Sequence, residues 1–158
     1  SVDTITGFTA VAADDVISID VSEINAEIGQ NLIDSSNDVF AFNAAVVQKF
    51  AEGDGNVAKA DIADGANIFI MSDTNNNALP GAAWELELDA AATTSGDGII
   101  LVHYDADGEY ASIGNFIDAG ANLDGKFTSG TAVFTELAQI TMTAAEFTAL
   151  DANNFAFS

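Results

Sequence analysis

The acidity of this chain is the feature that most constrains what it can fold into. The sequence holds 25 Asp and Glu against three Lys and no Arg, a formal net charge of -22 over 158 residues. A small domain typically carries a net charge of about 2–8 in magnitude, and each further carboxylate adds to the self-repulsion of the compact state. We therefore expect bound cations or high external salt to offset that repulsion.

The same charge argues against two classes of partner. Nucleic-acid binding needs Lys and Arg to neutralise phosphates, and docking on an anionic membrane surface needs a basic patch. The lysines are instead scattered, at Lys49, Lys59 and Lys126. No run approaches the roughly 20 apolar residues of a membrane-spanning helix. We expect neither a nucleic-acid partner nor membrane insertion.

The composition still predicts a folded protein. Disorder requires low hydrophobicity as well as high charge, whereas 49% of these residues are apolar and eleven are Phe. The length suits a single domain over residues 1–158. Because the chain has no Cys, disulfides and thiolate sites are excluded.

Hydrophobic patterning predicts a mainly β fold, a β-sandwich or a β-roll-like domain, with a few short helices. Alternating or continuous apolar runs bounded by turn residues mark the strands. These runs lie at 4–8, 16–21, 67–71, 84–88, 99–104, 110–117, 131–135, 138–142 and 155–157. The run at 99–104 is apolar almost throughout, which indicates a central strand buried on both faces.

Two regions favour helix. Residues 22–52 have the pattern of a helical insertion, because apolar residues over 24–33 recur at a spacing near 3.6 and those over 42–50 indicate a second helix. Near the C-terminus, Thr143 and Glu146 form a capping box that predicts a short helix directly after it.

Catalytic chemistry has little support among the residues. His103 is the only His and lies within a strand-like apolar run, which favours a structural role over that of a general base. Glu85 and Glu87 stand two residues apart, as expected for the solvated face of a strand, and resemble a glycosidase pair only superficially. Zinc and iron sites need His or Cys clusters. We expect a protein that is not an enzyme and has no small-molecule substrate.

Calcium is the cation that these side chains fit best, because it takes oxygen ligands from carboxylates, amides and the backbone. The candidate ligands fall in two turns, with Asp105, Asp107 and Glu109 in one and Asp73, Asn75 and Asn77 in the other. The second group matches the first positions of an EF-hand loop, but Ala78 and Trp84 stand where that loop needs Gly and Glu. A sparser group comprises Asp54, Asp61 and Asp64. Ordinary turn formation is the alternative for each group, since Asp, Asn and Gly are also turn residues.

Three short blocks along the chain match a known pattern. Residues 3–8 (DTITGF) and 14–20 (DDVISID) are similar to D-T-I-T-x-F … D-x-I-D-L, and residues 101–108 (LVHYDADG) are similar to L-x-Y-D-x-D-G. Residues 140–147 (ITMTAAEF) and 154–157 (NFAF) are similar to L-T-x-x-D-F-x-F. In this order the blocks resemble the C-terminal domain that follows the calcium-binding β-roll in bacterial RTX, or haemolysin-type, proteins, which are type I secretion substrates.

The resemblance implies export without an N-terminal signal and folding outside the cell, where calcium is abundant. It does not extend to the β-roll, because the glycine-rich nonapeptide repeat is absent from the sequence. The leading expectation is a secreted extracellular structural protein, a surface-layer, adhesin or fibre subunit. Calcium would promote its folding and its assembly into a homo-oligomer or polymer, through strands 4–8 and 155–157.

Two alternatives to this expectation stay open. The chain could be the C-terminal secretion domain of a larger exoenzyme, or an acidic viral or halophile coat protein whose charge is balanced by salt. The mass of the native protein separates the first alternative from a structural subunit, and sensitivity to chelators separates the second.

Overall fold

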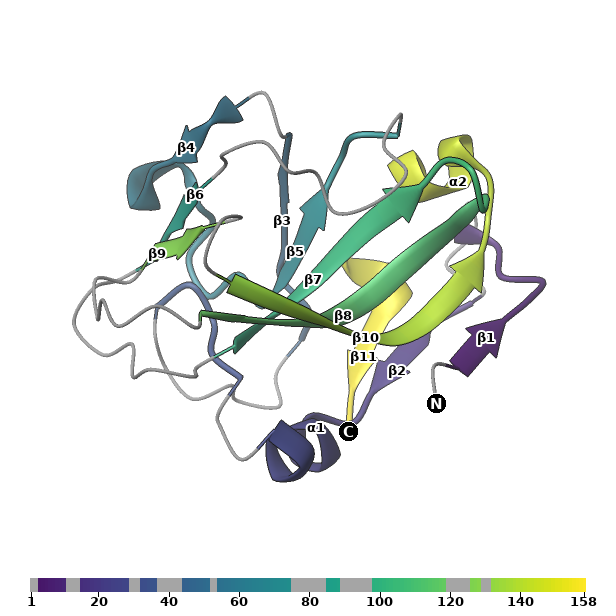
Figure 1. Ribbon diagram of the computed structural model, residues 1–158, viewed down its shortest axis with the longest axis horizontal. Helices are drawn as coiled ribbons and strands as arrows, with labels where there is room; N and C mark the ends of the chain where they lie inside the picture. The colour runs from purple at the N-terminus through teal and green to yellow at the C-terminus, as the bar shows by residue number, and fades with distance from the viewer. Residues whose placement is uncertain are drawn as a thin grey trace.

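Six strands form the largest sheet of the molecule, in the order β1-β10-β8-β7-β5-β3 (Figure 1). The computed structural model describes residues 3–10, 15–28, 32–36, 44–51, 54–74, 85–88, 98–118, 126–128 and 132–158. The strands of this sheet are β1 (Asp3–Ile5), β3 (Val47–Phe50), β5 (Ile68–Met71), β7 (Gly98–Asp105), β8 (Tyr110–Asp118) and β10 (Ala132–Thr141). The prediction of a mainly β protein is confirmed.

The sheet is mixed. β10, β8 and β7 form an antiparallel meander, whereas β1 joins β10, and β3 and β5 join β7, in parallel. Every residue of β7 except Asp105 is buried, so the prediction of a central strand covered on both faces is confirmed. β10 is one strand where the sequence predicts two, because a bulge between Glu136 and Ala138 shifts the register without ending the strand.

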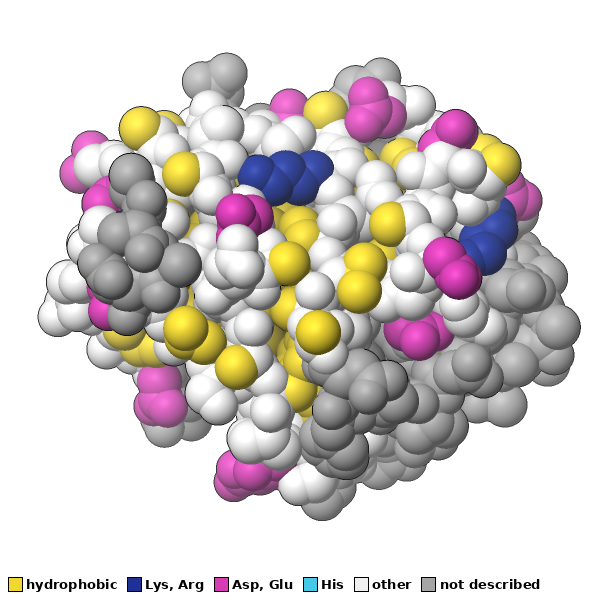
Figure 2. Space-filling view, turned by 180° about the vertical axis from the view of Figure 1, so that it is seen from behind, with side chains coloured by type: hydrophobic (Ala, Val, Ile, Leu, Met, Phe, Trp, Pro, Cys, Tyr) yellow, Lys and Arg dark blue, Asp and Glu magenta, His cyan; other side chains and the backbone are white. Residues whose placement is uncertain are grey.

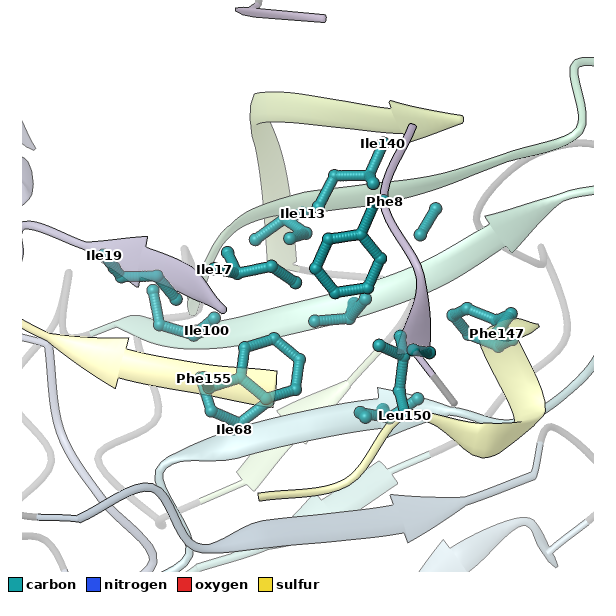
Figure 3. Close-up of a cluster of buried hydrophobic side chains, with 14 of the residues drawn as sticks. Phe8, Ile17, Ile19, Ile68, Ile100, Ile113, Ile140, Phe147, Leu150 and Phe155 are labelled. Atoms are coloured by element: carbon teal, nitrogen blue, oxygen red, sulfur yellow. The ribbon is translucent and has the colours of Figure 1, made fainter. Parts of the chain in front are cut away.

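Two smaller sheets cover the two faces of the large one. The parallel pair β2 (Ile17–Ile19) and β11 (Phe155–Phe157) packs with helix α2 (Ala144–Ala149) against one face, and Figure 3 shows their apolar side chains meeting those of the large sheet. The other face packs against a three-stranded sheet. Its strands are β4 (Asn56–Val57), β6 (Glu85–Glu87) and β9 (Lys126–Thr128). The continuous apolar runs of β5 and β7 follow from this double cover.

Side-chain caps determine where both α-helices begin. Asp20 directly precedes α1 (Val21–Ile28). Its Oδ1 accepts hydrogen bonds from the Ser22 hydroxyl at 2.7 Å and from the Glu23 N–H at 3.0 Å. α2 begins with the predicted capping box, in which Thr143 accepts from the Glu146 N–H and the Glu146 carboxylate accepts from the Thr143 N–H. That prediction is confirmed.

The predicted helical insertion is correct only at its start. α1 forms at 21–28, but Leu32 and Ile33 lie outside the helix, and residues 47–50 form β3 instead of a second helix. Val47 and Phe50 pack into different hydrophobic clusters, so the apolar spacing that resembles a helix face comes from a strand that makes apolar contacts on both of its faces. Residues 37–43 lie outside the described residues.

The first strand is also shorter than predicted. β1 ends at Ile5, Gly7 has φ 78°, and Phe8 then enters the core behind the sheet. Positive φ at a turn favours Gly because it lacks a Cβ. The chain therefore leaves the sheet edge after three residues.

Candidate functional site

Among the residues that the structure describes, one edge of the large sheet, at β1 and β10, has no further strand beside it. β1 pairs with β10 only over Ala138–Ile140, so among the described residues the outer side of Ala132–Leu137 has no neighbouring strand. All three residues of β1 are exposed, including Ile5, which keeps 40% of its surface accessible. We call the outer side of β1, together with Ala132–Leu137 of β10, the open edge. Unpaired N–H and C=O groups along such an edge are a template for another strand.

A groove of about 640 Å³ lies beside the open edge, between the large sheet on one side and β2 with the start of α1 on the other. We call it the edge groove. Its large apolar side chains come from five elements and are Ile5, Ile17, Ile19, Ile24, Ile113 and Leu137. Alternation in β2 places Ile17 and Ile19 inward and Ser18 outward, which gives the groove its apolar wall on that side.

Carboxylates surround this apolar lining. Asp3 of β1, and Asp20 and Glu23 at the start of α1, all line the edge groove, together with Glu136 of β10. Hydrogen bonds from the Glu23 N–H and the Ser22 hydroxyl hold the pKa of Asp20 below its ordinary value. The Glu136 carboxylate is bound by the Ser112 hydroxyl and by Gln139 Nε2. The groove therefore combines an apolar floor with an anionic rim.

Sequence patterning did not single out this groove. Asp3 and Asp20 stand within the blocks that resemble RTX proteins, but neither those blocks nor the alternation in β2 gives them a binding role. The groove depends on the register in which β1 pairs with β10, two strands from opposite ends of the chain. Local sequence patterns carry no information about such a pairing.

The first predicted calcium group lies in the hairpin between β7 and β8. Asp105 pairs with Tyr110 across the base of the hairpin, and residues 106–109 form its loop. Asp105 Oδ1 accepts from the Gly108 N–H at 2.8 Å, and its Oδ2 accepts from the Tyr110 hydroxyl at 3.1 Å. Asp107 and Glu109 are exposed, and Glu109 has φ 51°. The Asp105 carboxylate thus closes the loop by ordinary turn hydrogen bonds.

No group of three or more His, Asp or Glu side chains is gathered for a metal ion within the part of the chain that the structure describes. In the second predicted group, Asp73 follows β5 and is half-buried, whereas Asn75 and Asn77 lie outside the described residues. Asp54, Asp61 and Asp64 are exposed around the β4 region. Calcium binding at these turns stays a prediction.

His103 lies in a polar cluster on β7, β8 and β10. It pairs across the strands with Ser112, which pairs with Gln139. The Ser112 hydroxyl donates to Glu136, so its one proton is not shared with His103. Burial lowers the pKa of His103, and its ring packs edge-on against Phe134 at 5.3 Å between centroids. A nucleophile activated by His requires the hydrogen bond that this geometry lacks.

Four other charged residues, in β3, β6 and the turn after β4, are half-buried or bind main-chain carbonyls. Glu85 and Glu87 are half-buried on either side of the buried Leu86, as strand alternation predicts. Lys49 Nζ donates to the Thr148 carbonyl at 2.8 Å, and Lys59 Nζ donates to the Ser35 carbonyl at 2.7 Å. On the face shown in Figure 2, Asp and Glu side chains are spread over the surface, two of them beside lysines, and hydrophobic side chains gather near the middle.

The helices that the structure describes are too short or too polar to cross a membrane. Comparison with protein-family models, with curated proteins and with solved structures finds no match to this chain.

Proposed function

We propose that this chain is a secreted, extracellular structural subunit that assembles with copies of itself through the open edge, in a reaction promoted by calcium. The observation that carries the proposal is the exposure of β1. Asp3, Thr4 and Ile5 are all accessible, and within the described part of the chain β1 is paired only with β10. A strand from a second copy would satisfy the free backbone groups and cover Ile5.

Charge explains why assembly needs a cation. Two copies with a formal charge of -22 each repel strongly at low salt, where the Debye length is roughly 30 Å at 0.01 M. Divalent cations that bridge or neutralise carboxylates permit close approach at an ionic strength where sodium does not. The extracellular location, where calcium is abundant, rests on the resemblance to RTX secretion domains.

The second predicted contact, the C-terminal strand, is a weaker candidate. β11 is paired with β2, its Phe155 is buried, and Phe157 is half-buried in the same hydrophobic cluster. The main-chain N–H of Ser158 also donates to the Ile19 carbonyl. We therefore place the contact at β1.

Light scattering during a calcium titration tests the proposal, with sodium chloride at equal ionic strength as the reference. We expect calcium alone to produce oligomers. The variant Ile5→Asp puts a charge on the open edge and should raise the calcium concentration needed for assembly. Val16→Asp makes the same charge change at another exposed residue, 51% accessible, and should leave it unchanged.

Other outcomes distinguish the alternatives. A chain that stays monomeric in millimolar calcium at high protein concentration contradicts the proposal and favours the C-terminal domain of an exoenzyme. Equal assembly with both salts indicates general screening and favours a coat protein balanced by salt. Equal effects of Ile5→Asp and Val16→Asp would place the contact elsewhere.

A further inference from the structure

We propose that two copies of the chain pair through β1 in antiparallel orientation about a two-fold axis, and that assembly ends at this closed dimer. The inference rests on the proposed function and names the geometry of its contact. Two observations carry it. β1 is exposed, whereas at β3, the other terminal strand of the large sheet, a side chain already binds a carbonyl on the outer side.

The direction of the main-chain groups in β3 identifies that outer carbonyl. The carbonyls of Val46 and Phe50 accept hydrogen bonds from the N–H groups of Ile68 and Ser72, at the two ends of β5. The main-chain groups of successive residues in a strand point to opposite sides. The Lys49 carbonyl therefore points away from β5, to the side where a further strand would add.

Side chains oppose strand addition at this point. Gln48 Nε2 donates to the Lys49 carbonyl at 2.9 Å, and Gln48 Oε1 accepts from the Ala63 N–H at 2.8 Å, which holds the amide in place. Lys49 itself is exposed, and a Lys on a terminal strand opposes pairing with another chain. A head-to-tail filament would need β1 of one copy to pair with β3 of the next, and these side chains oppose that contact.

β1 lacks such protection among the described residues. Its three residues are exposed, and within the described part of the chain it pairs only with β10. Two identical strands that meet with the same faces of their sheets aligned are related by a two-fold axis, so they pair antiparallel and the contact closes in one dimer. Three residues from each copy make a small contact. Repulsion between the copies, and its relief by calcium, therefore decides whether the dimer forms.

Charge and backbone geometry select the register of the pair. A two-fold axis normal to the sheet passes beside one residue, which then lies opposite its own copy. An axis at Asp3 sets two carboxylates directly opposite each other, which is destabilising. An axis at Ile5 sets Asp3 against Gly7, where a φ of 78° has already turned the chain away. An axis at Thr4 uses all three residues of β1 and places each Asp3 opposite the Ile5 of the other copy.

A single introduced thiol tests the two-fold pairing, because the chain has no Cys of its own. Residues directly opposite each other in an antiparallel pair have Cα atoms about 4.5–5.5 Å apart, within the range of a disulfide. After mild oxidation, Thr4→Cys should run on a non-reducing gel as a linked dimer in calcium and as a monomer in EDTA. The control is Ser72→Cys, at an exposed residue that directly follows β5, and it should run as a monomer in both.

The register has a test of its own. A mixture of Asp3→Cys and Ile5→Cys chains should form the mixed disulfide, identified by mass spectrometry, because these residues lie opposite each other. Ile5→Cys alone should link poorly, since its two thiols stand on a diagonal about 7–8 Å apart. If Ile5→Cys links as readily as Thr4→Cys, the axis does not lie at Thr4 and the register is overturned.

The mass of the assembly tests closure. Analytical ultracentrifugation of the unchanged chain during the calcium titration should show a rise to twice the monomer mass and no further. A chain that shows no rise at all contradicts the proposed function itself. A rise beyond the dimer, or linkage at Ser72 and not at Thr4, would leave self-assembly standing and would overturn this inference.

Gln48→Val tests the protection of β3. The change frees the Lys49 carbonyl and puts a residue that favours strands on this edge, so β3 should also pair and species heavier than the dimer should form in calcium. Ile5→Asp added to Gln48→Val should restore the dimer, because only the β3 contact is left. A folded Gln48→Val chain that stops at the dimer would contradict the role given to Gln48. Linkage through Thr4→Cys decides the pairing of β1 independently of this variant.

Discussion

The Phe134 side chain of β10 lies over the backbone of Gly114 on β8, two residues from Phe116, its register partner on that strand. A Cβ built on Gly114 would fall 2.4 Å from Cζ of the Phe134 ring and 2.4 Å from the Thr135 carbonyl oxygen. The same ring packs edge-on against His103. The missing side chain at Gly114 is therefore what allows the aromatic side chain of β10 to cover the middle of the sheet.

Gly114→Ala should destabilise the fold. Contacts this short force the ring and the β10 backbone to shift, and overpacking of this kind typically costs about 1–3 kcal/mol. For a chain of this size that corresponds to a Tm lower by roughly 3–10 °C. Thermal unfolding followed by circular dichroism measures the change.

The matching double variant separates the two clashes. Gly114→Ala with Phe134→Leu relieves the contact with the ring but not the contact with the Thr135 carbonyl. We expect the double variant to lose less stability than the sum of the losses in the two single variants. It should still be less stable than the wild type, because the clash with the Thr135 carbonyl remains. A Gly114→Ala protein that melts like the wild type would contradict the packing described for β8 and β10.

Short-range signals in the sequence predicted the parts of the fold that local chemistry decides. The capping box at Thr143 and Glu146 needs only residues three apart, and the apolar run of β7 needs only cover on both faces. β3 was missed because Val47 and Phe50 face different clusters, a fact that depends on partners far along the chain.

The candidate site could not be predicted for the same reason. The edge groove depends on where β1 stops along β10, which is a register between the two ends of the chain. The sequence did point to the Asp105 turn, because Asp and Gly at fixed offsets are a local signal. The structure places that turn as predicted, and the calcium at it stays a prediction.

Calcium should raise the Tm of the chain by more than sodium does at equal ionic strength. A ligand that binds only the folded state stabilises it by RT ln(1 + [L]/Kd). Asp105→Asn with Asp107→Asn keeps the shape of the hairpin and removes two charges, so it should reduce the calcium-dependent rise. Differential scanning calorimetry in calcium and in EDTA provides the comparison.

The control for this pair is Asp3→Asn with Glu23→Gln, which removes the same charge from exposed residues outside the predicted calcium groups. It should leave the calcium response nearly intact. If both pairs respond to calcium like the wild type, the hairpin is not the site. If both lose the response equally, calcium acts by diffuse neutralisation of the surface.

The cap of α2 should give a measurable dependence of stability on pH. Hydrogen bonds from the Thr143 N–H and hydroxyl lower the pKa of Glu146 below its usual 4.5. A carboxyl with a depressed pKa stabilises the fold above the unfolded value, and that contribution is lost as the pH falls through the folded value. Glu146→Gln should therefore melt below the wild type at pH 7, and the gap should close in acid.

Two further variants check the cap. Thr143→Ala removes the hydroxyl and should cost about 1 kcal/mol, typical for an N-cap residue. Glu109→Gln removes one negative charge from an exposed residue outside the cap and serves as the control for the loss of charge. A constant difference between Glu146→Gln and the wild type from pH 7 to pH 3 would show that the cap does not titrate as described.

His103 should make the fold less stable as the pH falls below neutrality. Burial lowers its pKa below the usual 6.5, and the Tyr104 backbone and the carboxylates of Glu136 and Asp105 oppose that shift only in part. The unfolded chain therefore takes up the proton first, so stability is full above pH 6.5 and declines as the pH falls towards the folded pKa. Since the Nδ1 atom has no hydrogen-bond partner among the described residues, an apolar replacement removes a titrating group without breaking a bond to that atom.

His103→Leu tests this dependence by difference. The carboxylates titrate in both proteins, so subtracting the two pH profiles of the free energy of unfolding cancels most of their contribution and leaves that of the imidazole. We expect the free energy of unfolding of the variant to rise relative to that of the wild type as the pH falls from 6.5 to 5. Above pH 7.5 the difference between the two should stay constant. Chemical denaturation at each pH supplies the profiles. An offset that does not change with pH would mean that His103 takes up its proton as readily in the folded chain as in the unfolded one, and that burial does not control it.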